Sequence, residues 1–359
     1  MKNIIKFGII GSGWRARFFL RIAKMLPERF NATGIVVRNP EKGATIESVW
    51  GVKSYYNIED FLKKSDYSFI VVSVPSDVMA KIVIGLASQD IPALMETPPS
   101  GNVNGLVTLF KAIGPNAKVQ VSEQYSFQPQ NAAIINLIKS GKLGKVSQAQ
   151  VSIAHGYHGI SLIRKFLDIR FENAVIKGIP FKFPIVNGPG RNGIPRKEEI
   201  KTSEQTIAYL SFGSRVGVYD FTDDQYFSWI RSPRVLIRGE RGEINNSCIC
   251  YLQDFKTPIQ TEFLRQEAGQ NGNLEGFYLK GILAGNDWVY KNPFLPGRLS
   301  DDEIAVATCL EKMESYANGG PSFYSLAEAS QDTYLGIVID KATASGKTIR
   351  TKKQIWVPI

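Results

Sequence analysis

Histidine, cysteine and long apolar runs are scarce in this chain of 359 residues. The 3 cysteines are Cys248, Cys250 and Cys309, an odd number without the spacing of a disulfide framework or a zinc site. They predict reduced thiols and a cytoplasmic location. The apolar run at the N-terminus is interrupted by Lys6, is too short for a transmembrane helix and lacks the cleavage pattern of an export signal. We therefore expect no membrane partner.

Acidic residues are fewer than basic ones, 33 against 43, and the formal net charge is +10. Such a balance can indicate a nucleic-acid partner, but the basic residues are scattered and no aromatic-flanked binding motif accompanies them. We expect no nucleic-acid partner. A basic pocket for an acidic sugar stays open as an alternative, because guanidinium groups bind carboxylates. The arginines that could line it are Arg191, Arg196, Arg231, Arg234 and Arg238.

The chain has 2 histidines, His155 and His158, and both lie in the segment AHGYHGIS at residues 154–161. Histidine is the side chain whose ordinary pKa lies nearest neutrality, so these two are the first candidates for proton transfer. The alternative is a packing and hydrogen-bonding role at a helix start. No cysteine or carboxylate accompanies them at ligand spacing, so we expect no metal.

A nucleotide-binding fingerprint opens the chain. Residues 4–10 predict a buried strand, residues 11–15 a glycine turn and residues 17–23 a helix. This order places backbone N–H groups at a helix N-terminus, where they can hold a pyrophosphate. Ala16 stands where the usual motif has its last glycine, and a small residue is allowed there. The cofactor-binding residues expected here are Gly11, Ser12, Gly13, Trp14 and Arg15.

The second expected strand, residues 32–37, is followed by Arg38 and Asn39 instead of an acid. A carboxylate there would accept hydrogen bonds from the adenosine ribose of NAD, whereas a guanidinium suits the 2′-phosphate of NADP. The sequence therefore favours NADP and leaves NAD open. Stacking of Arg38 on adenine, or exposure to solvent, is the alternative.

Strands and helices alternate through the first third of the chain. Residues 67–75 and 91–99 predict strands and residues 77–87 a helix, which together indicate a parallel, doubly wound sheet. Because ligands of such sheets bind at the carboxyl ends of the strands, Gly11, Pro75 and Thr97 should lie at one edge with Arg38.

The later part of the chain predicts a different kind of sheet. Residues 205–212 and 215–221 alternate apolar and polar side chains, as in a sheet with one buried face. We expect a second subunit to cover the other face, giving a homodimer or homotetramer. Residues 178–196, rich in Pro and Gly, predict a long loop.

Taken together, these motifs resemble the Gfo/Idh/MocA oxidoreductases over nearly the whole chain. Segments that carry the resemblance include Val74-Pro75, Glu96-Thr97-Pro98, Gln124 to Pro129, Ser140 to Val146, the His158 segment, Gly239 to Gly242 and Ser325 to Lys347. The resemblance implies an NAD(P)-binding Rossmann domain over residues 1–122. It also implies a C-terminal α/β domain over residues 123–359 with a large, open, mainly antiparallel sheet. A helix near residues 325–345 would pack back on the first domain. Val74, Pro75 and Glu96 join the cofactor-binding set.

The chain departs from the family at its catalytic residues. Thr97 replaces the lysine of Glu-Lys-Pro, and of the histidine and two aspartates in Asp-x-Gly-x-His-x-x-Asp only His158 is kept. A neutral hydroxyl cannot replace a fixed positive charge beside the reacting oxygen. In a standard dehydrogenase mechanism, losing that charge should cost about 3 kcal/mol of transition-state stabilisation, or roughly a hundredfold in rate.

We expect a phenol to compensate for the missing charge. Tyr125 or Tyr157 would hold the reacting oxygen while His158 carries the proton, with Thr97 nearby. An aromatic wall is the alternative role for both tyrosines. The expected substrate contacts are His155, Glu123 and Arg191, although Glu123 could instead be a solvated or salt-bridged carboxylate.

The sequence thus predicts an NAD(P)-dependent oxidoreductase acting on a sugar or sugar-derived polyol. Two alternatives stay open. One is a redox-neutral epimerase, lyase or glycosidase that retains its NAD(P), and the other is a non-catalytic sensor of dinucleotide or sugar.

Overall fold

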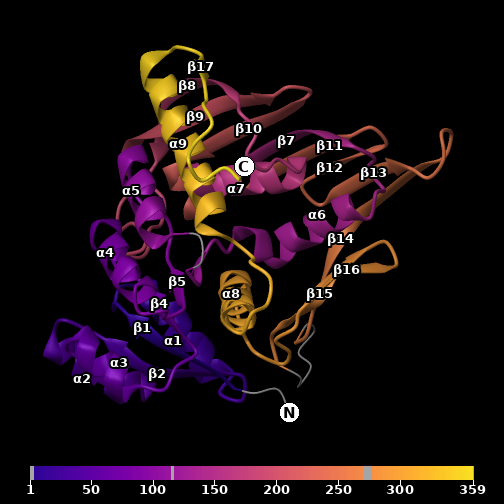
Figure 1. The fold of residues 1–359 in the computed structure, drawn as a ribbon. Helices are drawn as coiled ribbons and strands as arrows, with labels where there is room; N and C mark the ends of the chain where they lie inside the picture. The colour runs from indigo at the N-terminus through magenta and orange to yellow at the C-terminus, as the bar shows by residue number, and fades with distance from the viewer. Residues whose placement is uncertain (1–3, 115–116, 270–275, 359) are drawn as a thin grey trace. The chain divides into compact units, whose positions relative to one another are not determined.

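The computed structural model describes residues 4–114, 117–269 and 276–358 (Figure 1). The chain forms two compact units. Unit 1 contains Met1–Pro129, Gln266–Gly281 and Lys291–Ser330, and unit 2 contains Gln130–Arg265, Ile282–Tyr290 and Gln331–Ile359. Unit 1 therefore includes two later segments in addition to the N-terminal region that the sequence assigned to the Rossmann domain.

The sheet of unit 1 is parallel and has 6 strands in the order β3-β2-β1-β4-β5-β6. The strands are β1 (Ile5–Ile10), β2 (Phe30–Val36), β3 (Ser54–Tyr55), β4 (Phe69–Val72), β5 (Ala93–Met95) and β6 (Val119–Val121). This is the strand order of a dinucleotide-binding Rossmann fold. The predicted doubly wound sheet is confirmed.

Helices cover this sheet, and glycines let one of them approach it closely. The helices are α1 (Ala16–Met25), α2 (Pro40–Trp50), α3 (Ile58–Lys64), α4 (Ser76–Ala87), α5 (Val103–Ile113) and α8 (Asp301–Ala317). Gly8 of β1 pairs with Gly34 of β2. A Cβ on Gly8 would overlap the ring of Phe61 in α3, and a Cβ on Gly34 would overlap the ring of Tyr55 and crowd that of Phe61. The two glycines thus leave room for a buried aromatic ring on the sheet. Helix α8, although late in the sequence, packs against α1, β1 and β4.

A second late segment completes the edge of the same sheet. The side-chain oxygen of Gln120 in β6 accepts hydrogen bonds from the backbone N–H groups of Phe323 and Tyr324, at 3.0 and 2.9 Å. The backbone N–H of Val121 in turn donates to the carbonyl of Tyr324 at 2.9 Å. Gln120 is 1% exposed, so these bonds satisfy a buried amide and fix residues 322–325 beside β6.

The second sheet has 11 strands in the order β16-β15-β14-β13-β12-β11-β7-β10-β9-β8-β17. The strands are β7 (Val146–Ser152), β8 (Val175–Val186), β9 (Ile200–Phe212), β10 (Arg215–Thr222), β11 (Arg234–Gly239), β12 (Gly242–Asn245), β13 (Cys248–Leu252), β14 (Pro258–Glu267), β15 (Leu279–Ala284), β16 (Asp287–Lys291) and β17 (Ile349–Arg350). Neighbours from β8 to β10 and from β11 to β14 run antiparallel, whereas β7 and β10 run parallel. The predicted large, mainly antiparallel sheet is confirmed.

Three helices follow or flank these strands in the sequence, and one of them carries the predicted histidine segment. They are α6 (Pro129–Lys139), α7 (Gly156–Leu167) and α9 (Leu326–Ser345). A Cβ at Gly217 of β10 would overlap Ile163 of α7, so the helix rests directly on the strand. A buried ion pair between Arg164 and Asp332, 2.6 Å from Nη1 to Oδ1, joins α7 to α9. The predicted helix near residues 325–345 is present as α9.

The loop predicted over residues 178–196 is wrong in its first half. Residues through Val186 continue β8 and pair with β9 in an unbroken antiparallel register. Pro180 and Pro184 suggested a loop, but β17 pairs only with Val175 and Ile176 on the other side of β8. Beyond Ile176 the strand is therefore an edge, where a proline costs no ladder hydrogen bond.

Within the described residues, no helix combines the length and the apolar character that crossing a membrane requires.

Candidate functional site

The glycine turn after β1 is shaped to receive a phosphate. Gly11 has a φ of +112°, and a Cβ there would overlap the backbone of Ser73, which places the turn against the end of β4 beside Val74. At Gly13 a Cβ would meet nothing within 4 Å, so the space above the turn is open. Helix α1 begins there with no acidic residue in its first turn. Open space beside a helix N-terminus fits a dinucleotide pyrophosphate.

Other predicted cofactor residues follow the carboxyl ends of neighbouring parallel strands. Arg38 follows β2, Pro75 follows β4 and precedes α4, and Thr97 follows β5. Asn39 caps α2, its side chain accepting a hydrogen bond from the N–H of Lys42 at 2.9 Å. The side chain of Arg38 is exposed and forms no hydrogen bond or ion pair with the described residues. A guanidinium in this position is able to receive an anionic group.

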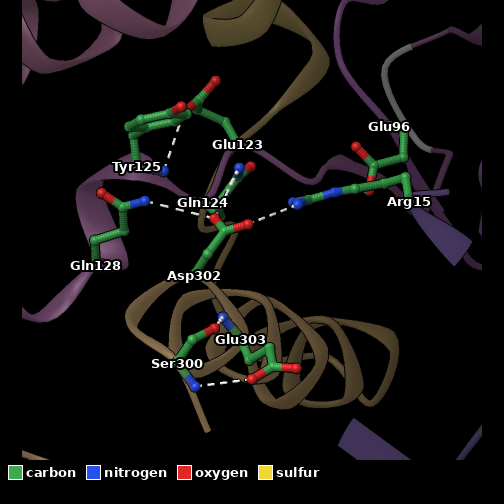
Figure 2. A network of polar contacts seen from close by, with 9 residues as sticks. All are labelled: Arg15, Glu96, Glu123, Gln124, Tyr125, Gln128, Ser300, Asp302 and Glu303. Carbon is green, nitrogen blue, oxygen red and sulfur yellow. Dashed lines mark hydrogen bonds and ion pairs between the residues drawn. The ribbon is translucent and has the colours of Figure 1, made fainter. Parts of the chain in front are cut away.

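The side chain of Arg15 belongs to a buried polar network (Figure 2). Its Nε lies 3.1 Å from Oε1 of Glu96, and its Nη1 lies 3.0 Å from Oδ2 of Asp302. The side chains of Arg15 and Glu96 are each 11% exposed. Both were predicted to bind the cofactor. In the structure their side chains form an ion pair with each other, and their role in cofactor binding stays a prediction.

Asp302, in the first turn of α8, accepts hydrogen bonds from several side chains of this network. Gln124 and Gln128 donate their side-chain N–H groups to its Oδ1, at 3.2 and 3.5 Å. Ser300 and Glu303 form a reciprocal capping box at the same helix start, which fixes the first turn of α8 (Figure 2). Asp302 therefore holds the glycine turn and residues 124–128 to one helix N-terminus, where a negative charge is favoured.

The charges in this network determine the state of Arg15. Burial alone lowers the pKa of Arg15, but the carboxylates of Glu96 and Asp302 outweigh burial, and the pKa is raised above its ordinary value. Arg15 is thus a permanent cation with two anionic partners. Its side chain stacks on Phe18, with the guanidinium carbon 4.8 Å from the ring centroid.

Glu123 and Tyr125, both predicted at the site, lie in the short segment between β6 and α6. Glu123 is 1% exposed, so it is not a solvated carboxylate. Its Oε1 accepts a hydrogen bond from the backbone N–H of Tyr125 at 3.1 Å (Figure 2). Tyr125 begins a 3-10 turn, Tyr125–Phe127.

In unit 2 the structure brings together three predicted residues at the start of α7. His155 precedes the helix, and Tyr157 and His158 lie in its first turn. The ring of His158 lies 4.3 Å from that of Tyr157 and 5.1 Å from that of His155, between centroids. His158 is 7% exposed. Ser161, where the family has an aspartate, donates its hydroxyl to the carbonyl of His158 at 2.8 Å.

Arg191, predicted as a substrate contact, lies elsewhere in unit 2. It sits in the exposed turn between β8 and β9, where Gly190 and Gly193 form an isolated β-bridge.

Two tyrosines that the sequence did not single out hold the start of α7. The hydroxyl of Tyr219 in β10 accepts from the backbone N–H of Gly156 at 2.8 Å, and that of Tyr226 accepts from the N–H of His155 at 3.0 Å. Burial raises the pKa of Tyr219, so it stays a neutral phenol. Phenols thus satisfy N–H groups that helix N-termini leave open.

The sequence did not single out Asp302 either, because its partner Arg15 is 287 residues away and no local pattern connects the two.

Among the described residues, no group of three or more His, Cys, Asp or Glu side chains is arranged to hold a metal ion.

The N-terminal region of the chain matches a known protein family. Residues 5–125 match the family model GFO_IDH_MocA, described as the oxidoreductase family with an NAD-binding Rossmann fold. Over residues 5–125 the chain is therefore similar to the Rossmann domain of the Gfo/Idh/MocA family. The matched region contains the glycine turn, Arg38, Glu96-Thr97-Pro98 and Glu123. The resemblance that the sequence motifs indicated is confirmed for this domain. No curated protein sequence matches the chain.

Solved structures extend the likeness of fold to the whole chain. Levoglucosan dehydrogenase in complex with NADH and levoglucosan is similar over 97% of this chain and 99% of its own, with a TM-score of 0.68 and 15% identity. An oxidoreductase from Agrobacterium radiobacter, in complex with NAD+, L-tartaric acid and magnesium, is similar over 97% of this chain and 98% of its own, with a TM-score of 0.66 and 14% identity. The WlbA dehydrogenase from Bordetella pertussis, in complex with NADH and UDP-GlcNAcA, is similar over 98% of this chain and 99% of its own, with a TM-score of 0.62 and 14% identity.

The Arg15 network predicts a large effect on stability. Arg15→Ala removes the cation and leaves two carboxylates facing each other, so the free energy of unfolding should fall by about 3 kcal/mol. Arg17→Ala, at an exposed position of the same helix, should change it by less than about 0.5 kcal/mol. Denaturant-induced unfolding measures both, and equal effects of the two substitutions would contradict the network's role.

Proposed function

We propose that the chain is an NAD(P)-dependent oxidoreductase that acts on a sugar or sugar-derived polyol. The observation that carries this proposal is the Gfo/Idh/MocA Rossmann domain with its open glycine turn at Gly13. His158, buried in the first turn of α7, is the proposed proton-transfer residue. The free thiols, Cys248, Cys250 and Cys309, support a reducing, cytoplasmic location.

The dinucleotide would be held by the residues at the carboxyl ends of the parallel strands. The backbone of Gly11, Ser12 and Gly13 would hold the pyrophosphate, and Arg38 would meet the adenosine ribose. When bound, the dinucleotide supplies or accepts a hydride. His158 takes the hydroxyl proton of the substrate on oxidation and returns it on reduction. Thr97 contributes a neutral hydroxyl near the end of β5.

The substrate class rests on the aromatic surroundings of the histidines and on the neighbours' ligands. Rings of Tyr157, Phe221 and Tyr226 lie around His155 and offer apolar faces of the kind that bind sugars. Two of the similar structures hold carbohydrate ligands, levoglucosan in one and UDP-GlcNAcA in the other.

A second candidate is a redox-neutral enzyme that retains its dinucleotide through the cycle. The observation that favours it is Thr97, which leaves the site without the family's lysine, while Arg15 is occupied by Glu96 and Asp302. Mass spectrometry of ligand released from the purified protein separates the two. Retained dinucleotide supports the redox-neutral enzyme, and its absence supports an exchanging oxidoreductase.

Arg38 should give preference for NADP. The unmodified protein should bind NADP more tightly than NAD, and Arg38→Ala should narrow the difference by about 1 to 3 kcal/mol, the range of a charged hydrogen bond. Titration calorimetry with both dinucleotides measures this, with Arg17→Ala as the control for loss of an exposed positive charge. Equal or tighter binding of NAD by the unmodified protein would refute the preference.

His158 should be required for turnover and not for cofactor binding. His158→Ala should lower turnover about a hundredfold or more, because alanine cannot accept the proton. Dinucleotide affinity should stay nearly unchanged, and His155→Ala should reduce turnover less. Dinucleotide reduction is followed by absorbance with a panel of hexoses, cyclitols, uronates and levoglucosan. Full activity of the His158→Ala variant on a substrate from this panel would show that His158 does not transfer the proton.

The open face of the second sheet should mediate self-association. Phe181 and Tyr209 lie on the face opposite α7 and are 42% and 51% exposed. Covering such side chains with a second copy removes apolar surface from water. Sedimentation velocity at micromolar concentration should show a dimer or tetramer, and Phe181→Lys should shift the protein to a smaller species. A monomer in the unmodified protein would argue against this interface.

A further inference from the structure

Tyr226 and His155 form a doubly hydrogen-bonded pair. The hydroxyl oxygen of Tyr226 accepts the backbone N–H of His155 at 3.0 Å, and the same oxygen lies 2.6 Å from Nδ1 of the His155 ring. One phenol thus contacts both the backbone and the side chain of a single residue. This arrangement restricts the rotation of the His155 ring about its side-chain bonds.

The segment that carries Tyr226 is itself anchored. It belongs to a short 3-10 turn, Asp223–Tyr226, between β10 and β11. Gln225 is 8% exposed and bonds Ser152 at the end of β7 twice, accepting from its hydroxyl at 3.3 Å and donating to its carbonyl at 2.5 Å. The Tyr226 ring packs edge-on against Phe221, with centroids 5.0 Å apart. Tyr226 therefore reaches His155 from a fixed position.

The chemistry of the two groups sets the direction of the bond to Nδ1. A phenol has an ordinary pKa of about 10, which makes it a better proton donor than a neutral imidazole N–H. An imidazole nitrogen is in turn a better acceptor than a phenol oxygen that already receives a backbone N–H. The Tyr226 hydroxyl therefore donates to Nδ1, and the ring proton of neutral His155 lies on Nε2.

We propose that Tyr226 is a positioning residue that holds His155 in the Nε2–H tautomer, and that His155 donates this N–H to the substrate oxygen on which His158 acts. The second part rests on the proposed function. A neutral imidazole donor can stabilise a developing oxyanion, and Thr97 stands in this chain where the family has the lysine that does so. His155 keeps its proton throughout, so the proton transferred in the reaction belongs to His158 alone.

The tautomer can be tested directly, because the chain has only 2 histidines. In the full-length protein labelled with 15N-histidine, long-range 1H–15N spectra above the histidine pKa give one pattern for each ring. Loss of one pattern in His158→Gln assigns the other to His155. We expect a protonated Nε2 and an unprotonated Nδ1 in His155. Tyr226→Phe should move the Nδ1 resonance and leave His158 in place.

The matched control is Tyr209→Phe, which removes an exposed phenol from β9 and should move neither histidine. A proton on Nδ1 of His155, or an unmoved resonance in Tyr226→Phe, would overturn the positioning role. This measurement needs neither dinucleotide nor substrate, so it stands even if no sugar of the panel is turned over.

Kinetics test the donor role of His155. Glutamine can place an amide N–H near the position of Nε2, whereas asparagine places it near that of Nδ1. With a substrate from the panel, His155→Asn should lower kcat about tenfold, while His155→Gln should stay within about threefold of the unmodified protein. Tyr226→Phe should lower kcat with the KM for dinucleotide unchanged. Equal losses in the two His155 variants would refute the donor role, whereas absence of turnover in the unmodified protein would refute the proposed function instead.

Discussion

The ion pairs of Arg15 are the interaction on which the nucleotide-binding half depends. A guanidinium at the glycine turn is held by Glu96 at the end of β5 and by Asp302 at the start of α8. A buried cation is stable only when it is matched by charge and hydrogen bonds. The network therefore fixes the turn, the strand end and the helix relative to one another. It also leaves the surface above Gly13 to backbone N–H groups.

Neutral side chains accept the backbone hydrogen bonds at the start of α7, where His155 and His158 lie. Where the family carries aspartates beside its histidine, this chain has Ala154 and Ser161, and neutral phenols satisfy the N–H groups at the start of α7. A phenol that accepts a hydrogen bond from a backbone N–H at this helix start adds no buried charge there.

The sequence predicted what depends on local patterns. The glycine turn and the alternating strands and helices of unit 1 have signals within a few residues, and each is present. The helix near residue 326, which the resemblance to the family implied, is also present. It failed for residues 178–186, where prolines suggested a loop, because only the pairing of whole strands shows that β8 is an edge there. Asp302 and Tyr226 were missed because their partners are 287 and 71 residues away. No local periodicity encodes a contact over such separations.

Helix α8 and residues 322–325 belong to unit 1 but come late in the sequence. Their position affects when unit 1 can fold during synthesis. The N-terminal strands emerge from the ribosome early, but the helix that supplies Asp302 and the segment that bonds Gln120 belong to the last sixth of the chain. Domains usually fold in order as they are synthesised. Here the first unit must wait for residues 302–324, which follow most of the second sheet in the sequence, before its buried arginine and glutamine find their partners. Its folding therefore depends on residues that are synthesised much later than its strands.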